Sequence, residues 1–233
     1  MKYIPLLFVL SIFSFEISTA QNLQTHFDLG EDRQMVTATF EMFKVDELGN
    51  TFYFIDFNFG GAKANVEGVS SAYYEIARSF LFWDNPFALH VELNSGMFRN
   101  DTFSAPINQA YLAGSSYTFI AQDFSKTFKV ALLYKYIQNK TNASFQLNTV
   151  WQIKLANDAL IFKGFTDFWK EENLVFDDQS NSYTTDFVFL SEPQLWYVLT
   201  PKFQLGSEVE ISANFAANKG LMINPTLGIK WIF

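Results

Sequence analysis

Long segments in which apolar and polar residues alternate are the feature that most constrains how this chain can fold. In TNASFQLNTVWQIK, residues 141–154, Phe145 and Leu147 share one face of an extended strand, while Gln146 and Asn148 share the other. The stretch FQLGSEVEISANF, residues 203–215, has the same pattern. The segments run to about 9–15 residues, whereas strands of soluble proteins usually have about 5–6. Tilted strands that cross a membrane need about 9–11 residues, so the pattern favours membrane strands.

The mature chain contains about twelve such segments, and an even number is typical of bacterial outer-membrane barrels. We therefore predict an all-β fold, a transmembrane antiparallel up-and-down β-barrel of about 12 strands. The segments lie near 22–30, 33–44, 50–59, 66–82, 86–95, 108–121, 126–138, 142–155, 158–171, 183–199, 202–215 and 219–233.

The connectors between these segments support a membrane barrel. Those after even-numbered segments are short, near 45–49, 83–85, 123–125, 157–158 and 200–201, whereas the opposite set includes the two longest, near 96–107 and 171–182. Short periplasmic turns and longer outer loops are typical of outer-membrane barrels. A soluble β-sandwich or barrel is the alternative. Against it stand the strand lengths and a polar face that is poor in Lys and Glu and carries Phe52, Phe54 and Trp196.

Residues 1–20 are predicted to be a signal peptide, leaving the barrel at 21–233. Lys2 precedes the apolar run IPLLFVLSIF, and small residues stand before Gln21, which fits cleavage near Ala20 and export to the outer membrane of a Gram-negative cell. The chain has no cysteine, which excludes a disulfide framework. Its formal charge of −8 argues against nucleic acid as a partner. We expect a monomer that contacts outer-membrane lipid, with no cofactor and no metal.

The last segment ends in TLGIKWIF, with an aromatic residue at the very end. In a barrel the last strand pairs with the first, so that no sheet edge stays free. Lipid-facing residues of this strand would be Leu227, Ile229, Trp231 and Phe233. The pattern resembles the signal that the outer-membrane barrel-assembly machinery reads, which makes that machinery an expected partner.

Several stretches resemble a Bacteroidetes-type family of small outer-membrane proteins: YFIDFNFGG, AYYEIARSF, IFKGFTDFW, FVFLSEPQLWYVL and NPTLGIKWIF. That family is in turn similar to the nucleoside-specific channel-forming proteins, the Tsx group, through GFTDF at residues 164–168. The resemblance implies a twelve-stranded monomeric barrel with a narrow pore. It also implies passive diffusion of nucleosides and related small solutes.

The polar face of the strands supplies the candidate lumen residues. Aromatic faces can stack on a base, and polar groups can hydrogen-bond ribose hydroxyls weakly enough for release. Each residue could equally serve the scaffold, for example through Glu92–Arg78 or Glu208–Lys230 ion pairs. The candidates are Phe52, Phe54, Asp56, Tyr73, Glu75, Arg78, His90, Glu92, Phe165, Asp167, Trp169, Glu192, Glu208, Glu210 and Lys230.

Three functions compete on this pattern. The leading one is an outer-membrane channel for passive diffusion of small solutes, with nucleosides favoured, and the second is a closed structural or accessory barrel in an envelope complex. A barrel enzyme is the third; it would need a nucleophile with a positioned base such as His90, and no G-x-S-x-G stretch is present, so we expect no enzyme. Acidic residues at 171–172 and 177–178 mark a solvated outer loop, with calcium binding as the alternative.

Overall fold

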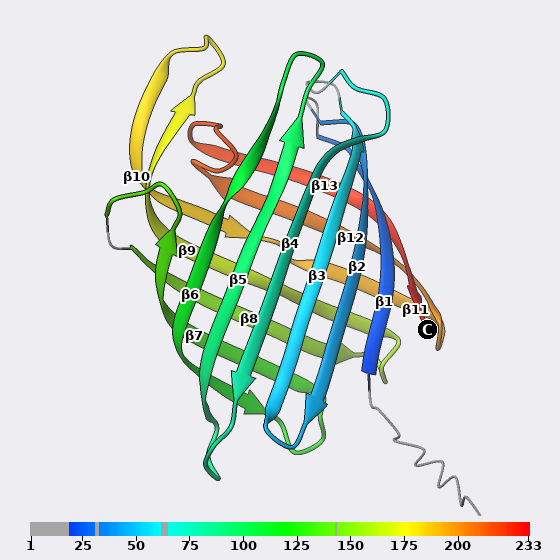
Figure 1. The fold of residues 1–233 in the computed structure, drawn as a ribbon. Helices are drawn as coiled ribbons and strands as arrows, with labels where there is room; N and C mark the ends of the chain where they lie inside the picture. Colours follow the sequence, from blue (N-terminus) through cyan, green and yellow to red (C-terminus); the bar gives the residue numbers. More distant parts are fainter. Residues whose placement is uncertain (1–18, 31–32, 62–64, 143) are drawn as a thin grey trace, which may run out of the picture.

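The computed structural model is a closed antiparallel β-barrel, and it describes residues 19–30, 33–61, 65–142 and 144–233 (Figure 1). With one exception, consecutive strands pair with each other, which gives the up-and-down order that the alternation predicts. The strands are β1 (Thr19–Asp28), β2 (Met35–Asp46), β3 (Gly49–Gly60), β4 (Val69–Phe80), β5 (Phe87–Arg99), β6 (Ser104–Ile120), β7 (Lys126–Ile137), β8 (Ser144–Leu155), β9 (Leu160–Phe176), β10 (Ser182–Ser191), β11 (Gln194–Thr200), β12 (Phe203–Ala213) and β13 (Leu221–Ile232).

The wall has twelve positions because β10 and β11 occupy one of them in succession. Both strands lie between β9 and β12, and only Glu192 and Pro193 separate them. Proline has no N–H to donate, so the hydrogen-bond ladder is interrupted there. Glu192 N–H still donates to Phe165 O at 3.0 Å, and Val209 N–H donates to Pro193 O at 3.0 Å. The predicted twelve-stranded all-β barrel is confirmed.

Pairing of the first strand with the last closes the barrel. Leu23 lies opposite Trp231, and Phe27 lies opposite Leu227. Phe233 N–H adds a hydrogen bond to Gln21 O at 3.3 Å, so backbone pairing continues to the last residue. The start of β1 and the end of β13 therefore lie at the same end of the barrel as the turns after β2, β4, β6 and β8.

Alternation along each strand sorts the side chains between two faces. Residues paired across neighbouring strands share a face, so one contact across the barrel identifies the lumen side of the whole wall. Lys163 of β9 reaches Glu41 of β2, and this face is therefore the lumen face. It also carries a buried apolar cluster that the alternation did not predict: Ala110, Leu112, Ala131, Leu133 and Ile137 on β6 and β7.

The prediction of two long outer loops, near 96–107 and 171–182, is wrong. Gly96 pairs with Ile107 and Arg99 with Ser104, leaving a connector of residues 100–103. Leu174 pairs with Thr184, leaving residues 177–181. Backbone pairing needs no apolar alternation, so these polar stretches extend the strands, and the two hairpins project at one end of the barrel (Figure 1).

The signal peptide prediction falls mostly outside the described residues, since 1–18 are not among them. No helix in the described part of the chain is long and apolar enough to cross a membrane.

Candidate functional site

The lumen face holds fourteen of the fifteen residues predicted for it. The strand registers place thirteen of them, and Glu192 follows by alternation between Leu190 and Gln194, which pair with Asp167 and Lys163. The exception is Arg78, and that prediction is wrong. Arg78 pairs with Thr51 and Val91, whose side chains point outward, whereas its neighbours Ala77 and Ser79 face the lumen. Its guanidinium donates to both carboxylate oxygens of Asp46 at 2.7 Å and lies 5.1 Å from the centre of the Phe80 ring.

Both predicted ion pairs are also wrong. Glu92 accepts a hydrogen bond from Asn94 Nδ2 at 3.0 Å and has no contact with Arg78, which lies on the other face of the sheet. Glu208 accepts a hydrogen bond from Gln194 Nε2. Lys230 lies opposite Gln204, four positions along β12 from Glu208, so the register keeps the two charges apart.

An aromatic stripe runs along the lumen face of β3 and β4. The ring centres of Phe52 and Phe54 are 6.0 Å apart, and those of Phe54 and Tyr73 are 5.9 Å apart. Phe43 of β2 lies opposite Phe52 and is 41% exposed, which extends the stripe toward the end of the barrel that holds the termini. Asp56 borders it and accepts a hydrogen bond from Thr39 Oγ1. The stripe offers ring faces beside a carboxylate, which suits a flat polar solute.

Two lumen tryptophans are covered by lysine ammonium groups. Lys135 Nζ lies 4.2 Å from the centre of the Trp169 ring, and Lys230 Nζ lies 3.9 Å from that of Trp196. Trp196 is fully buried, and its Nε1 donates to Gln194 Oε1 at 2.8 Å. The covered faces of both rings are occupied by these cation–π contacts, so we assign the two rings to the wall and not to solute stacking.

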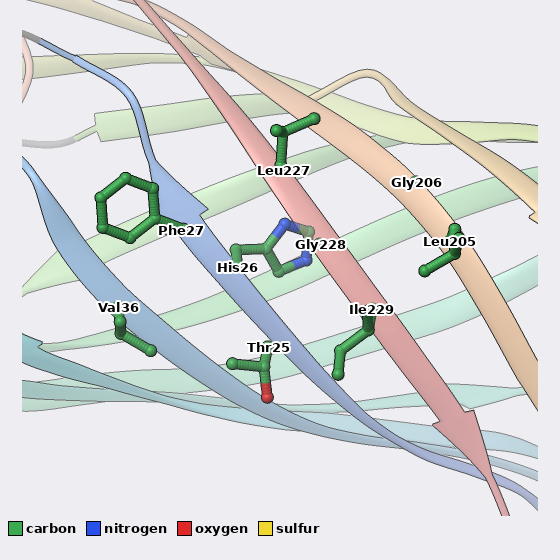
Figure 2. Close-up of a pocket in the computed structure, with 9 residues that line it drawn as sticks. All are labelled: Thr25, His26, Phe27, Val36, Leu205, Gly206, Leu227, Gly228 and Ile229. Carbon is green, nitrogen blue, oxygen red and sulfur yellow. The ribbon is translucent and has the colours of Figure 1, made fainter.

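His26 and Trp196 lie flat against the wall because two glycines face them. A Cβ on Gly228 would come within 2.8 Å of His26 Nδ1, and one on Gly206 within 2.5 Å of Trp196 Cε3. The two rings meet edge to face with centres 5.4 Å apart. The sequence did not identify His26 as a lumen residue. The feature that could have indicated it is the pairing of Gly206 with Gly228, which leaves room for the two rings. Figure 2 shows the ring beside Gly228, under an outer-face recess of about 400 Å³ lined mainly by Thr25, Phe27, Leu205, Leu227 and Ile229.

The predicted assembly-signal residues are on the outer face. Leu227, Ile229, Trp231 and Phe233 are 45–61% exposed. The Trp231 ring stacks on that of Phe203, with centres 6.3 Å apart, and its centre lies 5.2 Å from that of Phe233. Phe203 pairs with Trp231 near the end of the last strand, so these aromatics lie at the end of the barrel that holds the C-terminus.

His90 joins a buried hydrogen-bonded chain. Its Nδ1 lies 2.9 Å from Ser79 Oγ, and its Nε2 lies 3.4 Å from Glu92 Oε2. Lys129 Nζ is 3.3 Å from the same Nδ1 that contacts Ser79. Ser79 and His90 are only 3% and 2% exposed, so a substrate cannot reach the hydroxyl without moving the wall. A chain of this kind satisfies buried polar groups.

A second polar network lies on the lumen face of β8 and β9. Asp167 accepts hydrogen bonds from Gln146 Nε2 at 3.0 Å and from Asn148 Nδ2 at 2.8 Å. Lys135 Nζ donates to Gln146 Oε1 at 2.7 Å. Each donor lies on a neighbouring strand, which ties the wall together across the lumen face.

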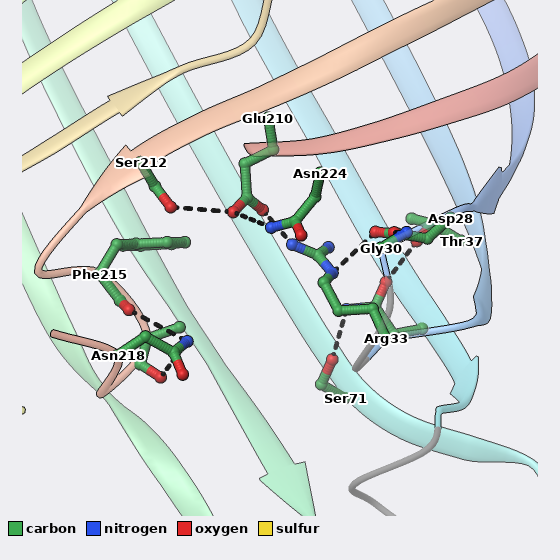
Figure 3. A network of polar contacts seen from close by, with 12 residues as sticks. Asp28, Gly30, Arg33, Thr37, Ser71, Glu210, Ser212, Phe215, Asn218 and Asn224 are labelled. Carbon is green, nitrogen blue, oxygen red and sulfur yellow. Dashed lines mark hydrogen bonds and ion pairs between the residues drawn. The ribbon is translucent and has the colours of Figure 1, made fainter. Parts of the chain in front are cut away.

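Arg33 links β1 and β12 at the end of the barrel away from the chain termini. It comes from the connector after β1, and its Nε lies 2.7 Å from Asp28 Oδ2 while its Nη1 donates to Glu210 (Figure 3). Glu210 also accepts hydrogen bonds from Ser212 Oγ and Asn224 Nδ2. The sequence identified Glu210 but not its partner: Arg33 stands at the start of the predicted segment 33–44, whereas the structure places it in the connector before β2.

The acidic connector at 177–181 is held by its own hydrogen bonds. Asp177 accepts from Asn181 Nδ2, Tyr183 OH and the Gln179 N–H, each at 3.0 Å. The hydrogen bond from the Asn181 side chain is the main cause that lowers the pKa of Asp177 below its ordinary value. Within the described ranges, no group of three or more His, Asp or Glu residues could hold a metal ion.

Comparisons with known proteins place the chain in a family. The model for a domain of unknown function, DUF5020, matches residues 20–233. The chain belongs to the DUF5020 family. Among curated proteins, no sequence matches it.

Solved porins share the fold of this DUF5020 protein. The structure described as the NanC porin superposes with a TM-score of 0.57 at 8% sequence identity, over 91% of this chain and 99% of that one. The KdgM porin superposes with a TM-score of 0.50 at 7% identity, over 92% and 99%. The superpositions show a common architecture, and at identities this low they show the fold alone. The expected resemblance to outer-membrane proteins is confirmed at the level of the fold.

Proposed function

We propose that this DUF5020 protein is an outer-membrane channel for the passive diffusion of small solutes. The barrel has a polar and charged lumen face and an apolar outer face, which suits a protein surrounded by lipid. Two structures of similar fold are described as porins. The protein would reach the outer membrane of a Gram-negative cell after cleavage near Ala20, assemble through its C-terminal strand and act as a monomer.

Nucleosides are the solutes that we propose the lumen favours. The observation that carries this is the aromatic stripe of Phe43, Phe52, Phe54 and Tyr73, bordered by Asp56. A base can slide along ring faces without being read at its edges, and carboxylates can accept hydrogen bonds from ribose. The other lumen acids, including Glu75, Glu192 and Glu208, also favour neutral or cationic solutes over anions.

Liposome swelling tests this proposal. Purified protein should admit adenosine faster than a sugar of the same size, and Phe54→Ala should reduce that preference. Tyr197→Ala removes an aromatic from the outer face and is the matched control, since Tyr197 is 52% exposed there. Equal rates for adenosine and the sugar in the unmodified protein would rule out nucleoside preference while leaving the channel.

A closed structural or accessory barrel is the second candidate, and one feature favours it. The buried apolar cluster that includes Leu112 and Leu133 fills space on the lumen face where a wide aqueous pore would need polar residues. Planar bilayers separate the two functions, because a closed barrel would give a current no larger than that of bare lipid. The burial of Ser79 and His90 gives the barrel enzyme no comparable support.

A further inference from the structure

One ion pair crosses the lumen from wall to wall. Lys163 Nζ lies 3.1 Å from Glu41 Oε1 and 3.2 Å from Oε2. Lys163 belongs to β9 and Glu41 to β2, which are five positions apart in one direction round the twelve-position wall and seven in the other. Among the described residues, the other ion pairs do not cross the lumen. Each lies within one strand or connector, or joins elements that are close together round the wall.

The carboxylate end of this pair is fixed by the wall. Glu41 Oε1 accepts a hydrogen bond from Asn22 Nδ2 at 3.0 Å, and Oε2 accepts one from Gln24 Nε2 at 3.4 Å. Asn22 lies directly opposite Glu41 on β1. With two amides and one ammonium group as donors, the Glu41 side chain is held pointing across the barrel.

The ammonium end has a second cation beside it. Lys230 lies over Trp196, and the charged groups that act on it are Lys163, Glu41 and Glu208. In the described part of the chain no carboxylate forms an ion pair with Lys230. The crossing point therefore has Lys230 as a second cation near the Glu41–Lys163 pair, in a lumen whose other charges are mostly acidic.

We propose that the Glu41–Lys163 pair is the constriction of the lumen and its charge filter. Two side chains that meet across a narrow barrel divide its cross-section, and a solute passes only beside them or by displacing one of them. A cationic group can take the place of Lys163 at Glu41, whereas an anionic group meets Lys163 and Lys230. These residues thereby decide the size and charge of what crosses, and this deepens the proposed channel function on which it rests.

Single-channel recording in planar bilayers tests the constriction. Lys163→Ala removes the crossing side chain, and conductance in KCl should rise about twofold or more because the narrowest section controls the flow. The exchange Glu41→Lys with Lys163→Glu restores the pair in reverse and should return the conductance toward the original value. Asp46→Asn with Arg78→Met removes an ion pair from the outer face and is the matched control, which should leave conductance unchanged.

Ion selectivity gives a readout that a purely structural role would not move. Lys163→Met should shift the K⁺/Cl⁻ permeability ratio toward K⁺, and Glu41→Gln should shift it toward Cl⁻. A heat-dependent gel shift of each variant checks that the barrel has formed.

The possible outcomes separate this proposal from the channel function. Variants that conduct when the unmodified protein does not would support the constriction and show that the native barrel is closed. A conducting native protein with unchanged conductance in Lys163→Ala and unchanged selectivity in Lys163→Met and Glu41→Gln would overturn the constriction and leave the channel. Failure of native protein and variants alike to conduct would overturn both.

Discussion

Leu132 and Leu133 are neighbours in β7, yet their surroundings differ completely. Leu132 is 62% exposed on the outer face, and Leu133 is 1% exposed on the lumen face. Outer-face residues touch mainly their neighbours in the wall, so each contributes almost independently. Lumen residues interlock, because the barrel brings many strands toward one axis. The same residue type therefore carries a different energetic role on each side of the wall.

Cavity formation should show this difference most strongly. Leu133→Ala removes packing from the cluster with Ala110, Leu112, Ala131 and Ile137, and we expect a loss of about 2–5 kcal/mol in the free energy of unfolding. The matched variant Leu132→Ala should cost less than about 1 kcal/mol, since mobile lipid chains fill the space. Urea unfolding of protein in vesicles measures both. Equal losses in the two variants would show that the lumen cluster is no better packed than the outer face.

Charge on the outer face is the next largest effect. Leu132 lies near the middle of β7, so Leu132→Arg should place a guanidinium in lipid at a cost of about 2–4 kcal/mol. Leu132→Met keeps the side chain apolar and is the control. The same urea titration gives the difference. A cost near zero for the arginine would mean that this face meets water, and the membrane barrel would then be wrong.

The two faces also differ in how far the sequence predicts them. Whether a residue faces out or in depends on alternation within its own strand, which is local, so the sequence located all twelve wall positions. The prediction for Arg78 was wrong because the lumen positions of that segment are held by its neighbours Ala77 and Ser79. The limits of β5, β6 and β9 were missed because polar hairpins pair without alternation.

Partners inside the lumen could not be predicted, because closure decides them. Glu41 and Lys163 are 122 residues apart, and no contact between them was predicted. Their strands do not pair, so no pattern within either strand connects them. His26 depends likewise on Gly228, a glycine of the last strand that lies opposite it only once the barrel has closed. The sequence therefore predicts the composition of the lumen and leaves its contacts to the three-dimensional structure.

Asp46 and Arg78 should show the smallest effect and complete the comparison. Their contact has shorter distances than the Glu41–Lys163 pair, with both at 2.7 Å. Asp46, however, is 40% exposed at the edge of the wall. Water solvates an exposed carboxylate nearly as well as a guanidinium does, so Asp46→Asn should leave the urea midpoint within experimental error. Glu41→Gln, in contrast, removes the carboxylate that pairs with Lys163 and leaves the neighbouring Lys163 and Lys230 charges less compensated, so it should lower the midpoint measurably. If Asp46→Asn were the more damaging change, surroundings would matter less than the geometry of the contact, and the distinction between the two faces would fail.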